Sequence, residues 1–301
     1  MVQIHLGTMT FGWAQASSPV DEPTAASFVS AFAAAGHSTI DCARIYAGGK
    51  SEAICGRVLQ AAGNRDALQI VTKAHPSQKD GLTPAGLRAQ VEASLAALQV
   101  AKIDLLYLHQ PDTTSALSDT LATVNELLSE GTIAAFGLSN YSAVEVERCV
   151  ELCKAAGYAL PVAYQGLYNA INRRVEEELL PTLRANGMAF VAYNPLAAGL
   201  LTGKHVQEGE VMKGRFKDNK NYLDRFYKPD LFEGLSLVRS ACEAAEISMV
   251  RATERLPARR RAPAVQQLWA AGVPAAAADA SGVCVTGRRV FPLAAASLCP
   301  C

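Results

Sequence analysis

The chain has 301 residues, with 28 basic and 28 acidic side chains and a formal charge of zero at neutral pH. Half of the residues are hydrophobic, which is enough to form one large core. The balanced charge argues against a nucleic-acid partner, because binding phosphates calls for a basic face. The apolar runs fall short of the roughly 18 residues that span a bilayer, and the N-terminus lacks the pattern of a signal peptide. We therefore expect a soluble, enzyme-like, cytoplasmic protein without a membrane partner.

The N-terminal part of the chain alternates apolar runs with helical repeats. Residues 2–9 predict a buried strand that opens into a loop with Trp13, and residues 21–35 predict a helix that stops at Gly36. Two further strands are expected at 39–43 and 68–74, followed by helices at 51–62 and 83–98. Thr83 before Pro84 is a typical helix start.

The same alternation continues through the middle of the chain. Strands are expected at 103–109, 133–140, 162–168 and 188–193, and helices at 117–128, 142–157 and 175–186. Ser142 and Glu145 form a capping-box pattern, and Pro181 is expected to bend the last of these helices. A long loop rich in Gly, Lys and Arg follows from 194 to about 228.

Seven strand and helix units of this kind predict a parallel sheet with right-handed crossovers. Seven units in fewer than 260 residues favour closure into a TIM-type (β/α)8 barrel, which commonly forms a single domain. The alternative is an open, doubly wound sheet. Against it, the first strand is not followed by the G-x-G-x-x-G pattern of dinucleotide-binding folds.

Eight cysteines are scattered through the chain, which is too large to need disulfides for stability. The first five are expected to be buried thiols: Cys42, Cys55, Cys149, Cys153 and Cys242. Cys149 and Cys153 lie four residues apart on a helical stretch without a nearby histidine pair, which is a poor metal-ligand pattern. No metal site is predicted.

Four chemically active side chains lie at or just after the ends of three successive predicted strands: Asp41, Tyr46, Lys73 and His109. In a parallel barrel these ends converge on the C-terminal rim, where active sites are built. Each residue alone has a structural explanation, as an ion pair, a satisfied polar group or a packing aromatic. The set of four favours a catalytic function.

Seven motifs in order resemble the aldo-keto reductase superfamily, and within it the aflatoxin-aldehyde reductase branch, over residues 1–256. The motifs are Gly7-Thr8-Met9, Asp41 to Tyr46, Thr72-Lys73-Ala74, His109, Leu138-Ser139-Asn140-Tyr141, Tyr164-Gln165, and Tyr193-Asn194-Pro195-Leu196 through Gly203-Lys204. The resemblance implies NADPH-dependent reduction of aldehydes or ketones to alcohols, with hydride transfer and a tyrosine proton donor.

The roles that the resemblance implies agree with the chemistry of the four residues. Tyr46 would give a proton to the carbonyl oxygen, and the charge of Lys73 would lower the pKa of that phenol. Asp41 would pair with Lys73 and hold it in place. His109 would donate a hydrogen bond to the carbonyl oxygen.

The resemblance also implies residues that bind cofactor and substrate. Ser139, Asn140 and Gln165 would hold the nicotinamide amide, Tyr193 would stack on its ring, and the loop after that strand would wrap the pyrophosphate. The cofactor set is Asp41, Ser139, Asn140, Gln165, Tyr193, Asn194, Pro195, Leu196, Gly199, Leu201, Gly203, Lys204 and Arg215. Trp13, His109 and Arg44 are the candidate substrate contacts. The alternatives are that Trp13 simply packs in the core, that Arg44 lies at the surface, and that Lys204 and Arg215 belong to a solvated loop.

The resemblance ends near residue 256, so we divide the chain into a barrel domain (1–256) and a divergent tail (257–301), with disorder as one option for the tail. Ala, Pro and Arg dominate the tail, and no convincing eighth strand and helix are recognised in it. The barrel is therefore expected to be incomplete or irregular at its eighth unit. In the family that unit holds the 2'-phosphate and adenine of the cofactor. Two weaker interpretations of the tail are a basic targeting patch at Arg259–Arg261 and a metal site at Cys299 and Cys301.

Two alternatives to an active enzyme remain open. The chain could keep the fold and lack activity, because the C-terminal cofactor-binding segment is missing. It could instead be a regulatory protein like the channel-associated β subunits, which share the fold. The relatives are often dimers, so a homodimer is a further expectation.

Overall fold

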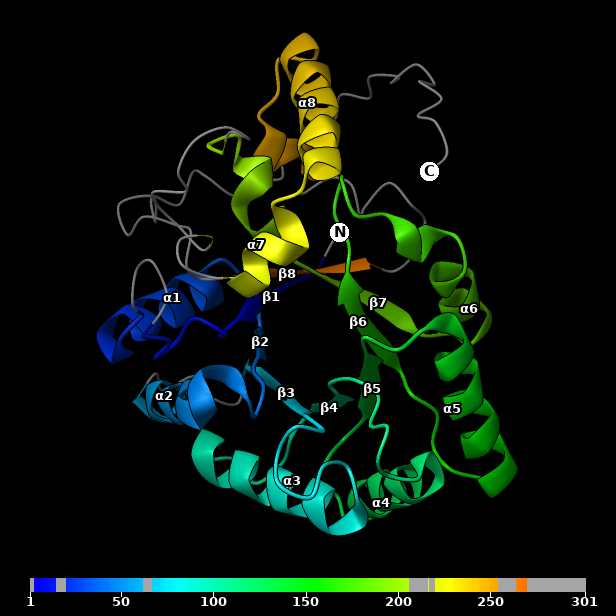
Figure 1. Cartoon of the computed structure of the whole chain (residues 1–301). Helices are drawn as coiled ribbons and strands as arrows, with labels where there is room; N and C mark the ends of the chain where they lie inside the picture. The colour runs from blue at the N-terminus through cyan, green and yellow to red at the C-terminus, as the bar shows by residue number, and fades with distance from the viewer. Residues whose placement is uncertain are drawn as a thin grey trace.

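A computed structural model describes residues 3–14, 20–61, 67–205, 216, 220–253 and 264–269. Eight parallel strands form a closed barrel in the order β1 to β8, and helices surround it (Figure 1). The predicted (β/α)8 architecture of the TIM type is confirmed. Among the helices in these ranges, none combines the length and apolar character that crossing a membrane requires.

The first seven strands lie where the apolar runs predict them. They are β1 (Gln3–Gly7), β2 (Thr39–Asp41), β3 (Gln69–Ala74), β4 (Leu105–Leu108), β5 (Phe136–Ser139), β6 (Ala163–Leu167) and β7 (Ala189–Tyr193). The register places Gly7 opposite Asp41, and Lys73 opposite Tyr107. Ser139 lies opposite Gln165. The polar strand ends therefore meet at one rim of the barrel.

Two of the helices between these strands begin with the capping groups that the sequence indicates. They are α1 (Glu22–Ala34), α2 (Lys50–Ala61), α3 (Pro84–Leu98), α4 (Leu117–Ser129) and α5 (Ala143–Ala156). The Thr83 side chain accepts a hydrogen bond from the N–H of Gly86 at the start of α3. Ser142 and Glu145 form the complete capping box at the start of α5. These contacts satisfy backbone groups that helix ends leave unpaired.

Two segments differ from the sequence-based expectation. The predicted bent helix at 175–186 is two short pieces, η3 (Arg174–Glu176) and α6 (Leu179–Ala185). The predicted loop from 194 to about 228 contains η4 (Ala197–Thr202) and α7 (Lys220–Phe226), and α8 (Pro229–Ala244) follows it. Helices this short depend on tertiary packing more than on local sequence, so periodicity identifies them poorly.

The expectation that no eighth strand follows residue 256 is wrong. Ala264–Trp269 forms β8, which pairs with both β1 and β7 and closes the barrel. Two open sheet edges would leave rows of unpaired backbone groups, and one strand inserted between them pairs both edges. The described residues do not include Arg259–Arg261 or residues 270–301, so the interpretations of the arginine patch and of Cys299 and Cys301 lie outside them. Apart from β8, the division at residue 256 stays a prediction.

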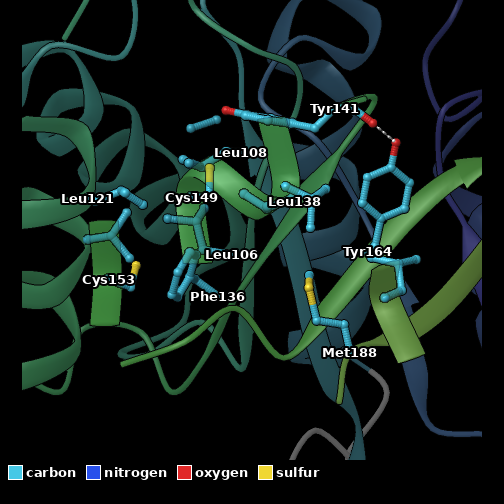
Figure 2. Close-up of a cluster of buried hydrophobic side chains, with 14 of the residues drawn as sticks. Leu106, Leu108, Leu121, Phe136, Leu138, Tyr141, Cys149, Cys153, Tyr164 and Met188 are labelled. Carbon is cyan, nitrogen blue, oxygen red and sulfur yellow. Dashed lines mark hydrogen bonds between the residues drawn. The ribbon is translucent and has the colours of Figure 1, made fainter. Parts of the chain in front are cut away.

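The largest part of the core lies between the outer face of the strands and the helices. Figure 2 shows Leu106, Leu108, Phe136 and Leu138 of the strands with Leu121, Cys149 and Cys153 of α4 and α5. The Tyr164 hydroxyl donates to the carbonyl oxygen of Tyr141 at 2.6 Å, so this buried phenol has a partner. The prediction of five buried free thiols is confirmed for Cys42, Cys55, Cys149, Cys153 and Cys242.

Candidate active site

Asp41 and Lys73 form an ion pair at the C-terminal ends of neighbouring strands. Both side chains are completely buried. The Lys73 ammonium donates to Oδ1 of Asp41 and to the carbonyl oxygen of Cys42, the latter at 2.7 Å. The other carboxylate oxygen of Asp41 accepts from Nε2 of Gln165 at 2.8 Å. Two charges in this environment need such complete pairing, because burial makes an unpaired charge very unfavourable.

Tyr46 lies in the segment between β2 and α2, beside this ion pair. Its ring centroid is 5.2 Å from the Lys73 ammonium, and the residue is buried. The His109 ring lies against it edge to face, with the two ring centroids 5.9 Å apart. The structure thus brings together all four residues of the predicted catalytic set.

The sequence predicts that Lys73 lowers the pKa of the Tyr46 phenol, but the net pKa in this structure is raised. Burial raises the pKa of Tyr46 well above its ordinary value of 10.0, and the negative charge of Asp41 adds to the effect. The physical reason is the removal of the phenol from water, which disfavours the charged phenolate more than the nearby ammonium favours it. The phenol therefore keeps its proton at neutral pH and is able to donate it.

His109 follows β4 and is neutral at physiological pH. Burial, followed by the charges of Lys73 and His75, holds the pKa of His109 well below its ordinary value of 6.5. Its Nδ1 atom is buried and has no hydrogen-bond partner among the described residues. A buried N–H without an acceptor would be unfavourable there, so we assign the proton to Nε2. The imidazole then has one N–H to donate.

The predicted nicotinamide-binding residues gather at the ends of β5, β6 and β7. Ser139 and Gln165 are buried, whereas Asn140 is exposed and has a positive φ of 61°. The Asn140 amide donates to the His109 carbonyl oxygen at 2.9 Å and accepts from the Tyr193 hydroxyl at 2.7 Å. These bonds link the strand ends, so the predicted cofactor residues and His109 form one hydrogen-bonded rim.

The loop after β7 has a backbone suited to an anionic ligand. Asn194, Ala197, Ala198, Gly199 and Gly203 all have positive φ, a conformation in which successive backbone N–H groups can form anion-binding concavities. The Asn194 side chain is buried, and its Oδ1 atom has no hydrogen-bond partner in the described part of the chain. Both observations fit a dinucleotide that approaches the rim and supplies a donor to that oxygen.

The other predicted members of the loop differ in exposure. Pro195 and Leu201 are buried, Leu196 is half-buried, and Lys204 is exposed, as a phosphate contact requires. Arg215 lies outside the described residues, so its predicted role is untested.

The predicted substrate contacts after β1 and β2, Trp13 and Arg44, differ in burial and in their existing partners. Trp13 is half-buried, and Phe11 beside it is completely buried in the core. Arg44 pairs with Glu52, a buried residue of α2. Its guanidinium is therefore already engaged by a carboxylate.

Residues of α7 join the rim in a way that the sequence did not indicate. The exposed Arg225 donates to the Tyr193 hydroxyl at 3.0 Å. The Tyr222 hydroxyl contacts Sδ of Met9 at 3.9 Å, so α7 reaches the loop after β1. Because this helix was predicted as loop, periodicity gave no signal for either residue. His75 was also missed, and its ring centroid lies 5.0 Å from that of His109.

Comparisons with known proteins agree with this architecture. The model of the aldo/keto reductase family matches residues 3–256. Human aldo-keto reductase family 7 member A3 is 44% identical over 247 residues, 80% of this chain and 73% of that protein. Human aflatoxin B1 aldehyde reductase member 2 is 43% identical over 247 residues, 80% of this chain and 67% of that protein.

A solved structure has the same fold over nearly the whole chain. Glycerol dehydrogenase AKR11B4 from Gluconobacter oxydans superposes with a TM-score of 0.76 at 25% identity, covering 96% of this chain and 87% of that one. The resemblance found in the sequence is confirmed by these matches. The chain belongs to the aldo/keto reductase family of oxidoreductases.

Proposed function

We propose that the protein reduces aldehydes or ketones to alcohols with NADPH, and that Tyr46 is the proton donor. The observation that carries the proposal is the meeting of Tyr46, His109 and the buried Asp41–Lys73 pair at one rim of the barrel. Similarity to proteins named as aflatoxin B1 aldehyde reductases supports an aldehyde as the substrate class.

Each catalytic group has a task that its environment permits. Burial keeps the Tyr46 phenol protonated until a carbonyl oxygen gains negative charge beside it. The Lys73 ammonium stabilises the phenolate that forms, and Asp41 holds that ammonium in place. The N–H assigned to Nε2 of His109 orients the carbonyl oxygen. When bound, NADPH supplies the hydride for the carbonyl carbon.

The residues available to hold the cofactor line the ends of β5 to β7. We propose that Ser139, Asn140 and Gln165 bind the nicotinamide amide and that Tyr193 packs against its ring. The loop from Asn194 to Lys204 would bind the pyrophosphate, with Asn194, Pro195, Leu196, Gly199, Leu201, Gly203 and Lys204 as its members. Asp41 would complete this set through its bond to Gln165.

The substrate would enter beside His109 and Trp13. The exposed guanidinium of Arg225 adds positive charge at the same rim, next to Tyr193. We propose no nucleic-acid or membrane partner and a cytoplasmic location. From the family resemblance we propose a homodimer, which sedimentation would test.

The experiment that tests the proposal combines binding with turnover. The purified chain is titrated with NADPH, and quenching of its tryptophan fluorescence is followed. Saturation at micromolar concentration corresponds to about −8 kcal/mol and is the expected result. Aldehyde is then added, and the near-ultraviolet absorbance of NADPH should fall with time.

Two other results would favour the alternatives. Absence of saturation in a folded chain would favour the inactive homologue. Tight binding without turnover of any aldehyde would favour a regulatory protein.

A further inference from the structure

A buried carboxylate lies on α2, next to the segment that carries Tyr46. The Glu52 side chain is 0% exposed and forms an ion pair with the Arg44 guanidinium. Its Oε1 atom accepts from the Thr72 hydroxyl at 2.6 Å. A buried ion pair contributes little net stability compared with apolar packing, and fixing one geometry is its better-attested use.

The pair joins a residue before Tyr46 to a residue after it. Between them, Ala47, Gly48 and Gly49 have φ angles of 50°, 64° and 89°. Gly48 and Gly49 accept these angles readily, whereas a left-handed alanine is unfavourable, so the conformation of Ala47 persists only when its surroundings hold it. The ion pair is one contact that closes this segment.

Gly49 shows how closely the Arg44 side chain packs on this turn. A Cβ atom added at Gly49 would lie 1.9 Å from Nη2 of Arg44. The guanidinium therefore lies against the backbone of the turn while it reaches Glu52. Only glycine accommodates this approach, since any side chain would displace the guanidinium.

The contacts of Glu52 and Ser51 connect the turn to the strands that carry Asp41 and Lys73. The Ser51 hydroxyl donates to the Thr8 carbonyl oxygen at 2.8 Å, and the Thr8 hydroxyl donates to the Asp41 carbonyl oxygen at 3.1 Å. Thr72, the partner of Glu52, immediately precedes Lys73 on β3. The start of α2 is thus fixed to β1, β2 and β3 at the level of the catalytic ion pair.

We propose that Glu52 is a positioning residue that, by pairing with Arg44 across the turn, holds the Tyr46 phenol beside the Lys73 ammonium. The inference rests on the proposed function, because it assumes that Tyr46 donates the proton. It also gives Arg44 a structural task in place of the predicted contact with substrate, for which a carboxylate would be the natural partner of a guanidinium.

The test compares Glu52→Gln with a matched control on the same helix. Arg57 of α2 pairs with Glu22 at 2.7 Å, and both side chains are nearly half exposed, so Arg57→Met removes an ion pair far from the rim. Each protein is assayed with two substrates, an uncharged aromatic aldehyde (para-nitrobenzaldehyde) and a carboxylated one (para-carboxybenzaldehyde). The NADPH dissociation constant, the melting temperature and the solvent deuterium isotope effect on kcat are measured alongside.

We expect Glu52→Gln to lower kcat roughly 10- to 100-fold for both aldehydes, the scale of loss that a misplaced reacting group causes. The Michaelis constants and the NADPH dissociation constant should stay close to those of the unmodified protein. The solvent isotope effect should rise, because proton transfer from a displaced Tyr46 becomes slower than the other steps. Arg57→Met should change none of these values.

A second variant keeps the proposal testable if Glu52→Gln does not fold. Arg44→Lys retains a positive charge opposite Glu52 but loses the planar fork, so it should show a smaller loss of kcat with the same isotope signature. A folded Glu52→Gln protein with normal kcat and isotope effect would overturn the inference. The inference would also be overturned if either variant changed only the Michaelis constant for the carboxylated aldehyde, because that result would assign Arg44 to the substrate.

Tyr46→Phe is assayed in parallel to separate the two levels of the proposal. Normal turnover by Tyr46→Phe would overturn the proposed proton donor, and the inference with it. Loss of turnover in Tyr46→Phe together with normal turnover in Glu52→Gln would overturn the inference alone.

Discussion

Substitution Asp41→Asn should be strongly destabilising, because it leaves the Lys73 ammonium without its counter-charge in a site that solvent does not reach. Both side chains are 0% exposed. Breaking a buried ion pair by removing one partner costs about 3 to 5 kcal/mol. The asparagine oxygen can still accept the hydrogen bond from Gln165, so the substitution mainly removes the negative charge.

The expected consequence is measurable by thermal unfolding. At about 2 °C per kcal/mol, the value for larger domains, the melting temperature should fall by roughly 6 to 10 °C. Glu22→Gln is the control, because the Glu22–Arg57 pair is 46% and 49% exposed and such pairs contribute about 0 to 1 kcal/mol. Equal melting temperatures for Asp41→Asn and Glu22→Gln would refute the assignment of a buried, mutually dependent pair.

Three further predictions concern the scaffold. Burial lowers the pKa of His5 from 6.5 to about 4, so unfolding takes up a proton below pH 6.5 and stability should fall by about 3 kcal/mol between pH 6.5 and 4. Urea unfolding of His5→Leu at several pH values should show that this loss of unfolding free energy between pH 6.5 and 4 has disappeared. An unchanged loss in His5→Leu would mean that other titrating groups cause it. Gly137→Ala should lower the free energy of unfolding by about 1 to 3 kcal/mol, since the new Cβ would lie 2.6 Å from the Tyr107 ring. A denaturation midpoint equal to that of the unmodified protein would show that the barrel interior has room for the methyl group. Ser142→Ala should cost about 1 kcal/mol by removing the cap of α5, whereas no change in the midpoint would mean that Glu145 or water replaces it.

Local signals in the sequence predicted the parts of the fold that local physics determines. The caps at Thr83 and Ser142 work through hydrogen bonds within a few residues, so their patterns are visible in the chain. The first seven strands follow from runs of apolar residues that a barrel buries on both faces. The meeting of Asp41, Tyr46, Lys73 and His109 could be predicted because parallel strands bring their ends to one rim.

The features that sequence reasoning missed depend on contacts between distant segments. The β8 strand is stabilised by two sheet edges more than 70 residues before it, which is the separation between Ala192 and Gln266. The pairing of Arg44 with a buried carboxylate also requires the turn geometry that only the folded chain provides. The burial of Tyr46 likewise depends on the folded chain, and it raises the pKa of the phenol where the charge of Lys73 predicted a lower one.

The most direct test of the account is the turnover of Tyr46→Phe with NADPH and an aldehyde, together with its NADPH affinity. Removing a positioned proton donor costs about 100- to 10,000-fold in rate, so kcat should fall by at least that lower value. The NADPH dissociation constant should match that of the unmodified protein, because Tyr46 is proposed to contact the substrate carbonyl and is not among the proposed cofactor-binding residues. Turnover comparable to that of the unmodified protein would contradict the assignment of Tyr46 as the proton donor.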